Sequence, residues 1–217
     1  MRMTRRLVRY LGIAALFCVL PGGAWAALPV GSVVMYSDGR VEKLLSREDG
    51  KLLWEDDRKR RYLRSENPIM PVLERRDFLS AKGYIQTLRS GDPDSISVRP
   101  SGDRVEFSLV RERASGTPSI RTWECTRHAA PRDKVLGEMR ELDVYRCERF
   151  VYHRKTWQRQ FRESREFAYS RDLGLIVEMH RKTTKKESKW RLSSVVTPDK
   201  ATYKQLSRKV RKLRGRN

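Results

Sequence analysis

The sequence predicts a mainly β protein: a small N-terminal β-hairpin module, then a larger antiparallel curved sheet or sandwich, and a basic C-terminal helix. Three observations support this fold class. Asp-Gly turns separate short apolar runs in the first third, polar and apolar residues alternate over most of the rest, and apolar residues recur at helical spacing near the end. The hydrophobic fraction is only 38%, but the aromatic residues can build a core from few side chains.

Residues 1–26 have the features of a secretory signal peptide. Four arginines flank the start of an uncharged apolar run, 11–20, and Ala24-Trp25-Ala26 supplies the small–x–small pattern of a cleavage site. The run is short for a membrane anchor, so an uncleaved anchor is the weaker alternative. We expect a mature protein that begins near Ala27 and is exported, most simply to the periplasm.

Residues 28–73 are expected to form the small β-hairpin module. Asp38-Gly39 and Asp49-Gly50 lie between apolar runs, which is a strong hairpin signal because glycine tolerates positive φ. The predicted strands are residues 32–36, 40–45, 51–54 and 61–64.

Residues 74–94 are predicted to be a connector with a short helix around 77–88, and residues 95–197 an antiparallel β domain. The domain shows period two, as in Val105, Phe107 and Leu109. Residues 198–217 are expected to form a helix that starts at Thr197-Pro198-Asp199.

The formal net charge of +21 indicates an anionic partner. Outside the cytoplasm the candidates are anionic lipid, lipopolysaccharide phosphates and cell-wall polymers. The predicted export argues against nucleic acid. The sequence leaves the oligomeric state open.

Cys125 and Cys147 are the only cysteines after residue 26. In an oxidising compartment such a pair most simply forms one disulfide, with Cα atoms about 4.4–6.8 Å apart on neighbouring strands. A Cys125 nucleophile near His128 is the alternative, and it requires a free thiol.

Motifs for enzymes, metals and cofactors are absent from the sequence. His128, His153 and His180 lack metal-ligand spacing, and there is no nucleophile elbow, P-loop or dinucleotide fingerprint. We therefore expect no catalytic residues, no metal and no cofactor. An enzyme that acts on cell-wall or glycan material would need two carboxylates in one cleft, and Glu163 is the residue to examine.

The segment 157–169 combines arginines and aromatic residues. Period two places Arg159, Glu163 and Arg165 on one face with its aromatic residues. Such a face is able to bind an anionic or sugar-like ligand, because arginine stacks on rings and pairs with phosphate. The candidates are Arg149, Trp157, Arg159, Arg165 and Tyr169. Alternatively, Glu163 pairs with the arginines and the row lies in solvent at a sheet edge.

The C-terminal segment has a narrow apolar stripe, Leu206, Val210 and Leu213, and no acidic residue after Asp199. A basic helix of this kind is able to lie on an anionic membrane. The alternative is that the stripe docks on the β domain. The candidate surface-binding residues are Lys204, Arg208, Lys209, Arg211, Lys212, Arg214 and Arg216.

Several short motifs resemble an uncharacterised group of exported bacterial β-rich proteins. They are Gly31, Asp38-Gly39-Arg40, Trp54, Asn67-Pro68 with Pro71, Trp123-x-Cys125, and Tyr169-Ser170-x-x-Leu173-Gly174-x-x-Val177. Arg171 stands where related patterns carry proline. The resemblance implies a periplasmic β-rich fold in which the last motif turns one long strand into the next, and it implies no activity.

Together these observations predict a non-enzymatic envelope protein, a β-rich binding or structural module at an anionic surface or ligand. Two alternatives remain: a periplasmic enzyme, and a lipid or lipoprotein carrier with a large apolar concave face.

Overall fold

The computed structural model describes residues 27–217 except 81, 115, 130–131, 154 and 216–217. The predicted signal peptide and Arg216 of the tail lie outside the described residues. Among the helices in the described part, none is long and apolar enough to cross a membrane.

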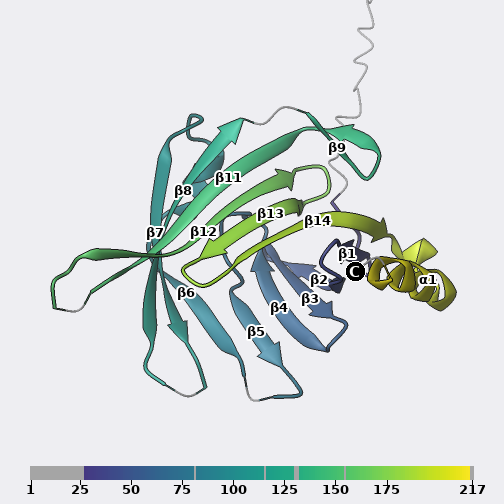
Figure 1. Cartoon of the computed structure of the whole chain (residues 1–217), viewed down its shortest axis with the longest axis horizontal. Helices are drawn as coiled ribbons and strands as arrows, with labels where there is room; N and C mark the ends of the chain where they lie inside the picture. Colours follow the sequence, from purple (N-terminus) through teal and green to yellow (C-terminus); the bar gives the residue numbers. More distant parts are fainter. Residues whose placement is uncertain (1–26, 81, 115, 130–131, 154, 216–217) are drawn as a thin grey trace, which may run out of the picture.

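Twelve strands form one closed barrel in which all neighbours are antiparallel (Figure 1). In chain order the barrel strands are β1 (Val33–Tyr36), β2 (Val41–Glu48), β3 (Lys51–Asp56), β4 (Arg60–Ser65), β5 (Glu74–Asp77), β6 (Tyr84–Gly91), β7 (Arg104–Glu112), β8 (Ser119–Ala129), β11 (Leu142–Tyr152), β12 (Arg159–Ser170), β13 (Leu175–Thr183) and β14 (Glu187–Val196). The short strands β9 (Asp133–Val135) and β10 (Glu138–Arg140) pair with each other between β8 and β11.

The mainly β class and the C-terminal helix are confirmed, but the architecture predicted for the strands is wrong. Instead of a small module and a curved sheet or sandwich, β1 pairs with both β2 and β14 and closes a single barrel. The segment predicted as connector and helix supplies β5 and β6. Closure leaves no edge strand with unpaired backbone groups, which is the physical advantage of a barrel over an open sheet.

The Asp-Gly hairpin predicted between the second and third runs is confirmed. Asp49 and Gly50 connect β2 to β3, and both have positive φ, 48° and 68°. Two successive residues with positive φ are typical of the type I′ turn, whose twist matches that of the flanking strands.

The interior is packed at one end of the barrel, which we call the closed end. Ile69, between β4 and β5, and Ile96, in the 3₁₀ helix η1 (Pro93–Ser97), lie there against the inward row Val105, Phe107 and Leu109 of β7. All five side chains are buried. The turns β4–β5 and β6–β7 that carry these residues belong to the same end because the strands alternate in direction.

Cys125 of β8 and Cys147 of β11 lie directly opposite each other and form a disulfide. Their Cα atoms are 4.1 Å apart, slightly closer than expected. Both cysteines are buried.

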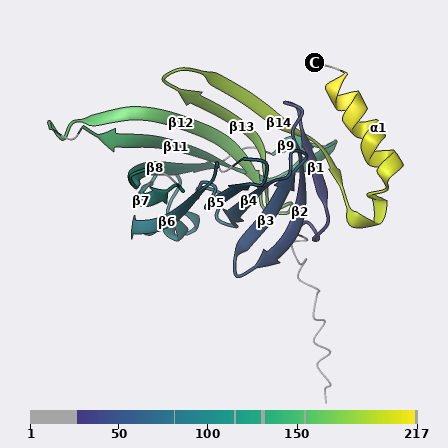
Figure 2. The same cartoon turned by 90° about the horizontal axis from the view of Figure 1, so that it is seen from below.

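The helix α1 (Tyr203–Arg214) lies outside the barrel, next to β1 and β14 (Figure 2). The predicted start is shifted: Pro198–Lys200 forms the short 3₁₀ helix η2, and Thr202 caps α1 by accepting a hydrogen bond from the Gln205 backbone N–H at 3.3 Å. The Pro-Asp signal therefore marks a separate turn before the helix.

Candidate functional site

The barrel end opposite the closed end is built from six turns. Leaving aside residues 81, 115 and 154, which lie outside the described part, they are residues 37–40, 57–59, 78–83, 113–118, 153–158 and 184–186. Strands that alternate in direction bring these turns to one end of the barrel. We call it the arginine end, for the residues described next.

Arginines continue the buried apolar rows of several strands into the arginine end. On β7, Arg111 continues the buried inward row that contains Phe107 and Leu109. On the neighbouring strand β8, Arg121 lies directly opposite Leu109. Because side chains alternate across a strand, each arginine shares its face with the core residues two positions away. We call five such residues the arginine cluster: Arg111, Arg121, Arg149, Arg165 and Arg181.

Glu163 of β12 compensates part of this charge. Its carboxylate accepts hydrogen bonds from the Nε atoms of Arg165 and Arg181 at 2.7 Å and of Arg149 at 3.2 Å. The residue is only 1% exposed. Burial alone would raise the pKa of Glu163, but the adjacent Arg165 and Arg181 lower it to about 2. Glu163 is therefore ionised at neutral pH.

Arg111 and Arg121 have no carboxylate partner within the described residues. Burial lowers the pKa of Arg121 to about 10, and repulsion from Arg111 and Arg149 acts in the same direction. The Nε atom of Arg121 is buried without a hydrogen-bond partner. Arg111 donates through Nε to Gln86 Oε1 at 2.9 Å. These two side chains thus bring positive charge into the barrel that no carboxylate of the described part of the chain neutralises.

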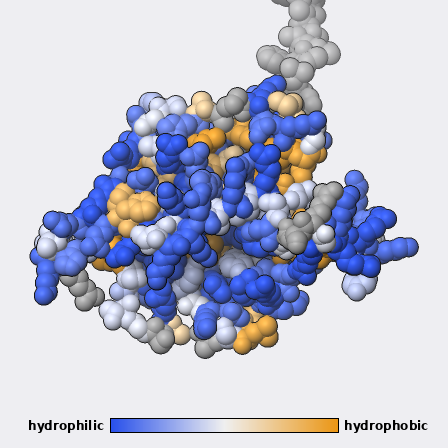
Figure 3. All heavy atoms as spheres, in the orientation of Figure 1, coloured by the Kyte–Doolittle hydropathy of each residue, from blue (hydrophilic) through white to orange (hydrophobic). Residues whose placement is uncertain are grey.

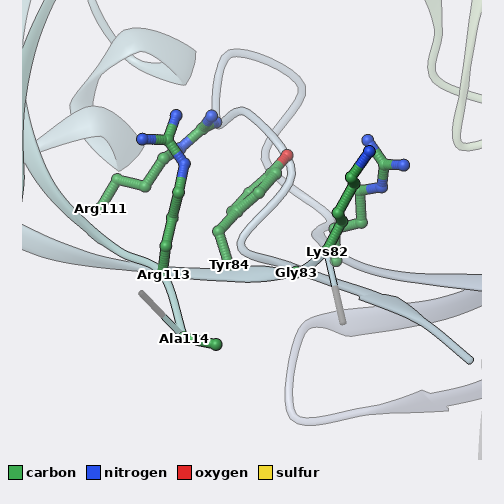
Figure 4. A pocket seen from close by; sticks show the side chains of 7 residues that line it. Lys82, Gly83, Tyr84, Arg111, Arg113 and Ala114 are labelled. Carbon is green, nitrogen blue, oxygen red and sulfur yellow. The ribbon is translucent and has the colours of Figure 1, made fainter. Parts of the chain in front are cut away.

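Arg111 also lines a cavity of about 330 Å³ at the arginine end (Figure 4). Its guanidinium lies 3.7 Å from the centre of the Tyr84 ring, a cation–π contact. Figure 4 shows the Tyr84 ring between Arg111 and Arg113 on one side and Lys82 on the other. The lining residues are Arg75, Lys82, Gly83, Tyr84, Arg111, Arg113 and Ala114.

The cavity has the chemistry of an anion site. Four of its lining residues are cationic, none is acidic, and Tyr84 adds a hydroxyl. Guanidinium groups present paired N–H donors that match phosphate and carboxylate oxygens. The volume is near the lower limit of small-ligand pockets, which suits a compact charged group. In the part of the chain that the structure describes, no three His, Cys, Asp or Glu residues are placed to hold a metal.

The structure brings together only part of the anionic-ligand site expected from sequence. Arg149 and Arg165 lie side by side, with their guanidinium groups 5.9 and 4.5 Å from the Trp123 ring centre. Tyr169 lies farther along β12, packed against the core of the closed end. Trp157 is in the exposed turn between β11 and β12.

The expectation that Arg159 shares a face with Arg165 is wrong. In the β11–β12 ladder, Arg149 of β11 lies opposite Glu163 of β12, but the next residue of β11, Phe150, lies opposite Phe161. The ladder therefore has a bulge at this point, with one extra residue in β12. The extra residue in β12 reverses the alternation, so Arg159 faces outward. There it pairs with Glu124 and lies 3.4 Å from the Phe150 ring centre.

Sequence reasoning missed five residues of the cavity lining, Arg75, Lys82, Tyr84, Arg111 and Arg113, and two further members of the arginine cluster, Arg121 and Arg181. One signal was present for two of them. Arg111 is in phase with Val105, Phe107 and Leu109, and Arg121 is in phase with Trp123 and Cys125. A charged residue in phase with a buried row is a candidate for the interior.

The apolar stripe of α1 is docked on the barrel. Leu206, Val210 and Leu213 pack against a buried group formed by β1 and β14, whose members are Val33, Met35 and Val196. Lys209 Nζ donates to Ser194 Oγ at 3.0 Å, and Arg214 pairs with Asp57. Lys204, Arg208, Arg211 and Lys212 are exposed. While α1 is docked, the face that it leaves exposed carries these charges and Tyr203.

Deletion of residues 202–217 is expected to lower the melting temperature by about 4–8 °C. The deletion exposes Val33, Met35 and Val196, and a loss of about 2 kcal/mol shifts a domain of this size by that amount. The measurement is differential scanning calorimetry. Arg208→Ser with Lys212→Ser is the control and should leave the melting temperature unchanged; an unchanged value after the deletion would contradict the docked contact.

No protein-family model matches this chain, and no curated protein matches it. Among solved structures, the chain is similar to that of the hypothetical lipoprotein YmcC from Escherichia coli K12, with a TM-score of 0.48 and 11% sequence identity. The match covers 79% of this chain and 89% of that one. A likeness at this level carries no conclusion about ligand or activity.

Proposed function

We propose that this protein is a non-enzymatic binding module of the cell envelope that takes an anionic, phosphate-bearing group at the arginine end of its barrel. The envelope location rests on the predicted signal peptide. The observation that carries the proposal is the charge imbalance in the arginine cluster: Glu163 pairs with three of its five arginines, and no carboxylate among the described residues pairs with Arg111 or Arg121. Burying an uncompensated cation costs free energy, and a bound anion offsets that cost.

The two alternative functions have less support. A lipid carrier needs a large apolar cavity. The cavity that Arg111 lines is bordered by cations, the adjoining cavity by both basic and acidic residues, and the closed end is filled by Ile69 and Ile96. A paired-carboxylate enzyme needs a second acid near Glu163, but Glu163 is contacted by Arg149, Arg165 and Arg181. With a pKa of about 2, Glu163 is also a poor proton donor at neutral pH.

Pyrophosphate is expected to raise the melting temperature of the protein, and the double variant Arg111→Met with Arg121→Met is expected to lose this shift. A ligand at 100 times its Kd stabilises the folded state by about 2.7 kcal/mol. The variant removes two half-buried charges and keeps the apolar stems, so its own melting temperature should equal or exceed that of the unchanged protein. The measurement is thermal unfolding with and without pyrophosphate, with isothermal titration calorimetry for the Kd.

The matched control is Arg104→Met with Arg146→Met, two exposed arginines on the outer face of β7 and β11. This variant loses the same formal charge and should keep the full pyrophosphate shift. An equal loss in both variants would mean that net charge alone binds the anion. No shift in the unchanged protein at millimolar pyrophosphate would overturn the proposal.

A further inference from the structure

We propose that the arginine end docks on a bilayer that contains anionic phospholipid, with apolar hairpin tips among the head groups and a lipid phosphate at the arginine cluster. This inference rests on the proposed function and names the source of the phosphate. It follows from three features of the arginine end that the anion cavity alone does not explain.

The first feature is a set of exposed apolar side chains in the turns of this end. Phe78 and Leu79 follow β5, Tyr152 is the last residue of β11, and Trp157 lies in the turn between β11 and β12. Leu79 is 80% exposed and Trp157 76% exposed. Figure 3 shows separate hydrophobic patches on a mostly hydrophilic face. Aromatic side chains with both an apolar body and a polar group are favoured at membrane interfaces.

The second feature is the backbone of Trp157. Its φ is 54°, a left-handed conformation that is unfavourable for a bulky residue. Two backbone hydrogen bonds hold the turn: Trp157 N–H donates to His153 O at 2.9 Å, and His153 N–H donates to Gln158 O at 2.9 Å. The turn therefore holds the Trp157 side chain in solvent although the backbone conformation of this residue is unfavourable. A functional role for an exposed aromatic side chain at this position explains that conformational cost.

The third feature is the charge of the same turns. Lys59, Lys155, Lys185 and Lys186 are exposed in three of them, and Arg113 lines the cavity in a fourth. Cations beside apolar tips match a surface that is negative at the head groups and apolar just below them. The charge complementarity favours an anionic bilayer as the occupant over a neutral protein surface.

The helix α1 lies away from the apolar tips. Figures 1 and 2 both show it on the side of the barrel opposite the β11–β12 hairpin. Its apolar stripe is already buried against β1 and β14. Arg214 of α1 reaches one turn of the arginine end, where it pairs with Asp57. The apolar tips lie in other turns, so variants of the tips leave α1 unchanged.

The test uses flotation of the purified protein with vesicles of phosphatidylglycerol and phosphatidylcholine, compared with phosphatidylcholine alone. We expect binding only to the anionic vesicles. The double variant Leu79→Ser with Trp157→Ser should bind them at least tenfold more weakly, because it lacks two apolar side chains that would otherwise transfer from water into the bilayer. Vesicles with brominated acyl chains should quench Trp157, so the quenching should be lost in this variant. The matched control, Val98→Ser with Tyr203→Ser, removes two equally exposed apolar side chains away from this end and should bind as the unchanged protein does.

Each outcome separates docking from anion binding. A pyrophosphate shift without vesicle binding overturns the docking and leaves the proposed function in place. If vesicle binding depends on the tips but pyrophosphate does not shift the melting temperature, the docking is supported and the proposed phosphate site is overturned. Binding that is lost in Arg208→Ser with Lys212→Ser, but not in the tip variant, assigns the surface to α1 and overturns the inference.

Discussion

Replacing Glu163 with glutamine is expected to lower the free energy of unfolding by about 3 kcal/mol, the largest effect of any single substitution considered for this protein. The variant keeps the shape of the side chain but removes the charge that Arg149, Arg165 and Arg181 share. Breaking a buried ion pair leaves uncompensated charge in the interior. The expected value is at the lower end of the usual range because the three arginines keep some contact with water. Urea denaturation measures it.

The neighbouring substitution Glu166→Gln is the control. Glu166 pairs with Arg146 on the outer face, where both side chains are about half exposed, so its loss should cost less than about 0.5 kcal/mol. Equal effects of the two substitutions would show that Glu163 contributes no more than a surface ion pair.

The pH dependence of the free energy of unfolding provides a second test of the ion pairs that Glu163 forms. The pKa of Glu163 is about 2 in the folded protein and near 4.3 in an unfolded chain. Because the folded value is lower, the stabilisation is complete above about pH 4.3 and is lost as the pH falls toward 2. The difference between the unchanged protein and Glu163→Gln should therefore shrink over this interval. A constant difference would contradict the assignment.

Replacing Cys125 and Cys147 together with alanine is expected to lower the free energy of unfolding by about 3 kcal/mol, mainly because the unfolded chain gains freedom. The crosslink joins residues 22 positions apart in the sequence, inside the cluster that contains Phe107, Trp123 and Phe167. Because both sulfurs are buried, the folded protein should resist mild reductant.

Urea denaturation of the alanine variant and of the reduced protein measures this loss. The two should agree within about 1 kcal/mol, with a small further cost for the volume that alanine leaves empty. A loss below about 1 kcal/mol would mean that the crosslink stabilises the fold very little.

The anion site was only partly predictable. The sequence shows that segment 157–169 mixes arginine with aromatic residues, and Arg149 and Arg165 do meet in the structure. The bulge opposite Arg149 separates Arg159 from them. Whether one strand carries an extra residue depends on its partner, so the period of a single strand does not reveal it.

By itself, the sequence determined the features that depend on neighbouring residues: strand alternation, the Asp49-Gly50 hairpin, the cysteine pair and the apolar stripe of the terminal helix. Only the tertiary structure decided the closure of the barrel, the face of Arg159 and the meeting of arginines from five strands. The physical reason is that these features depend on pairing between distant segments, as when Val33 of β1 meets Val196 of β14. A local pattern sets which face of a strand is buried, but the partner strands decide what that face encloses.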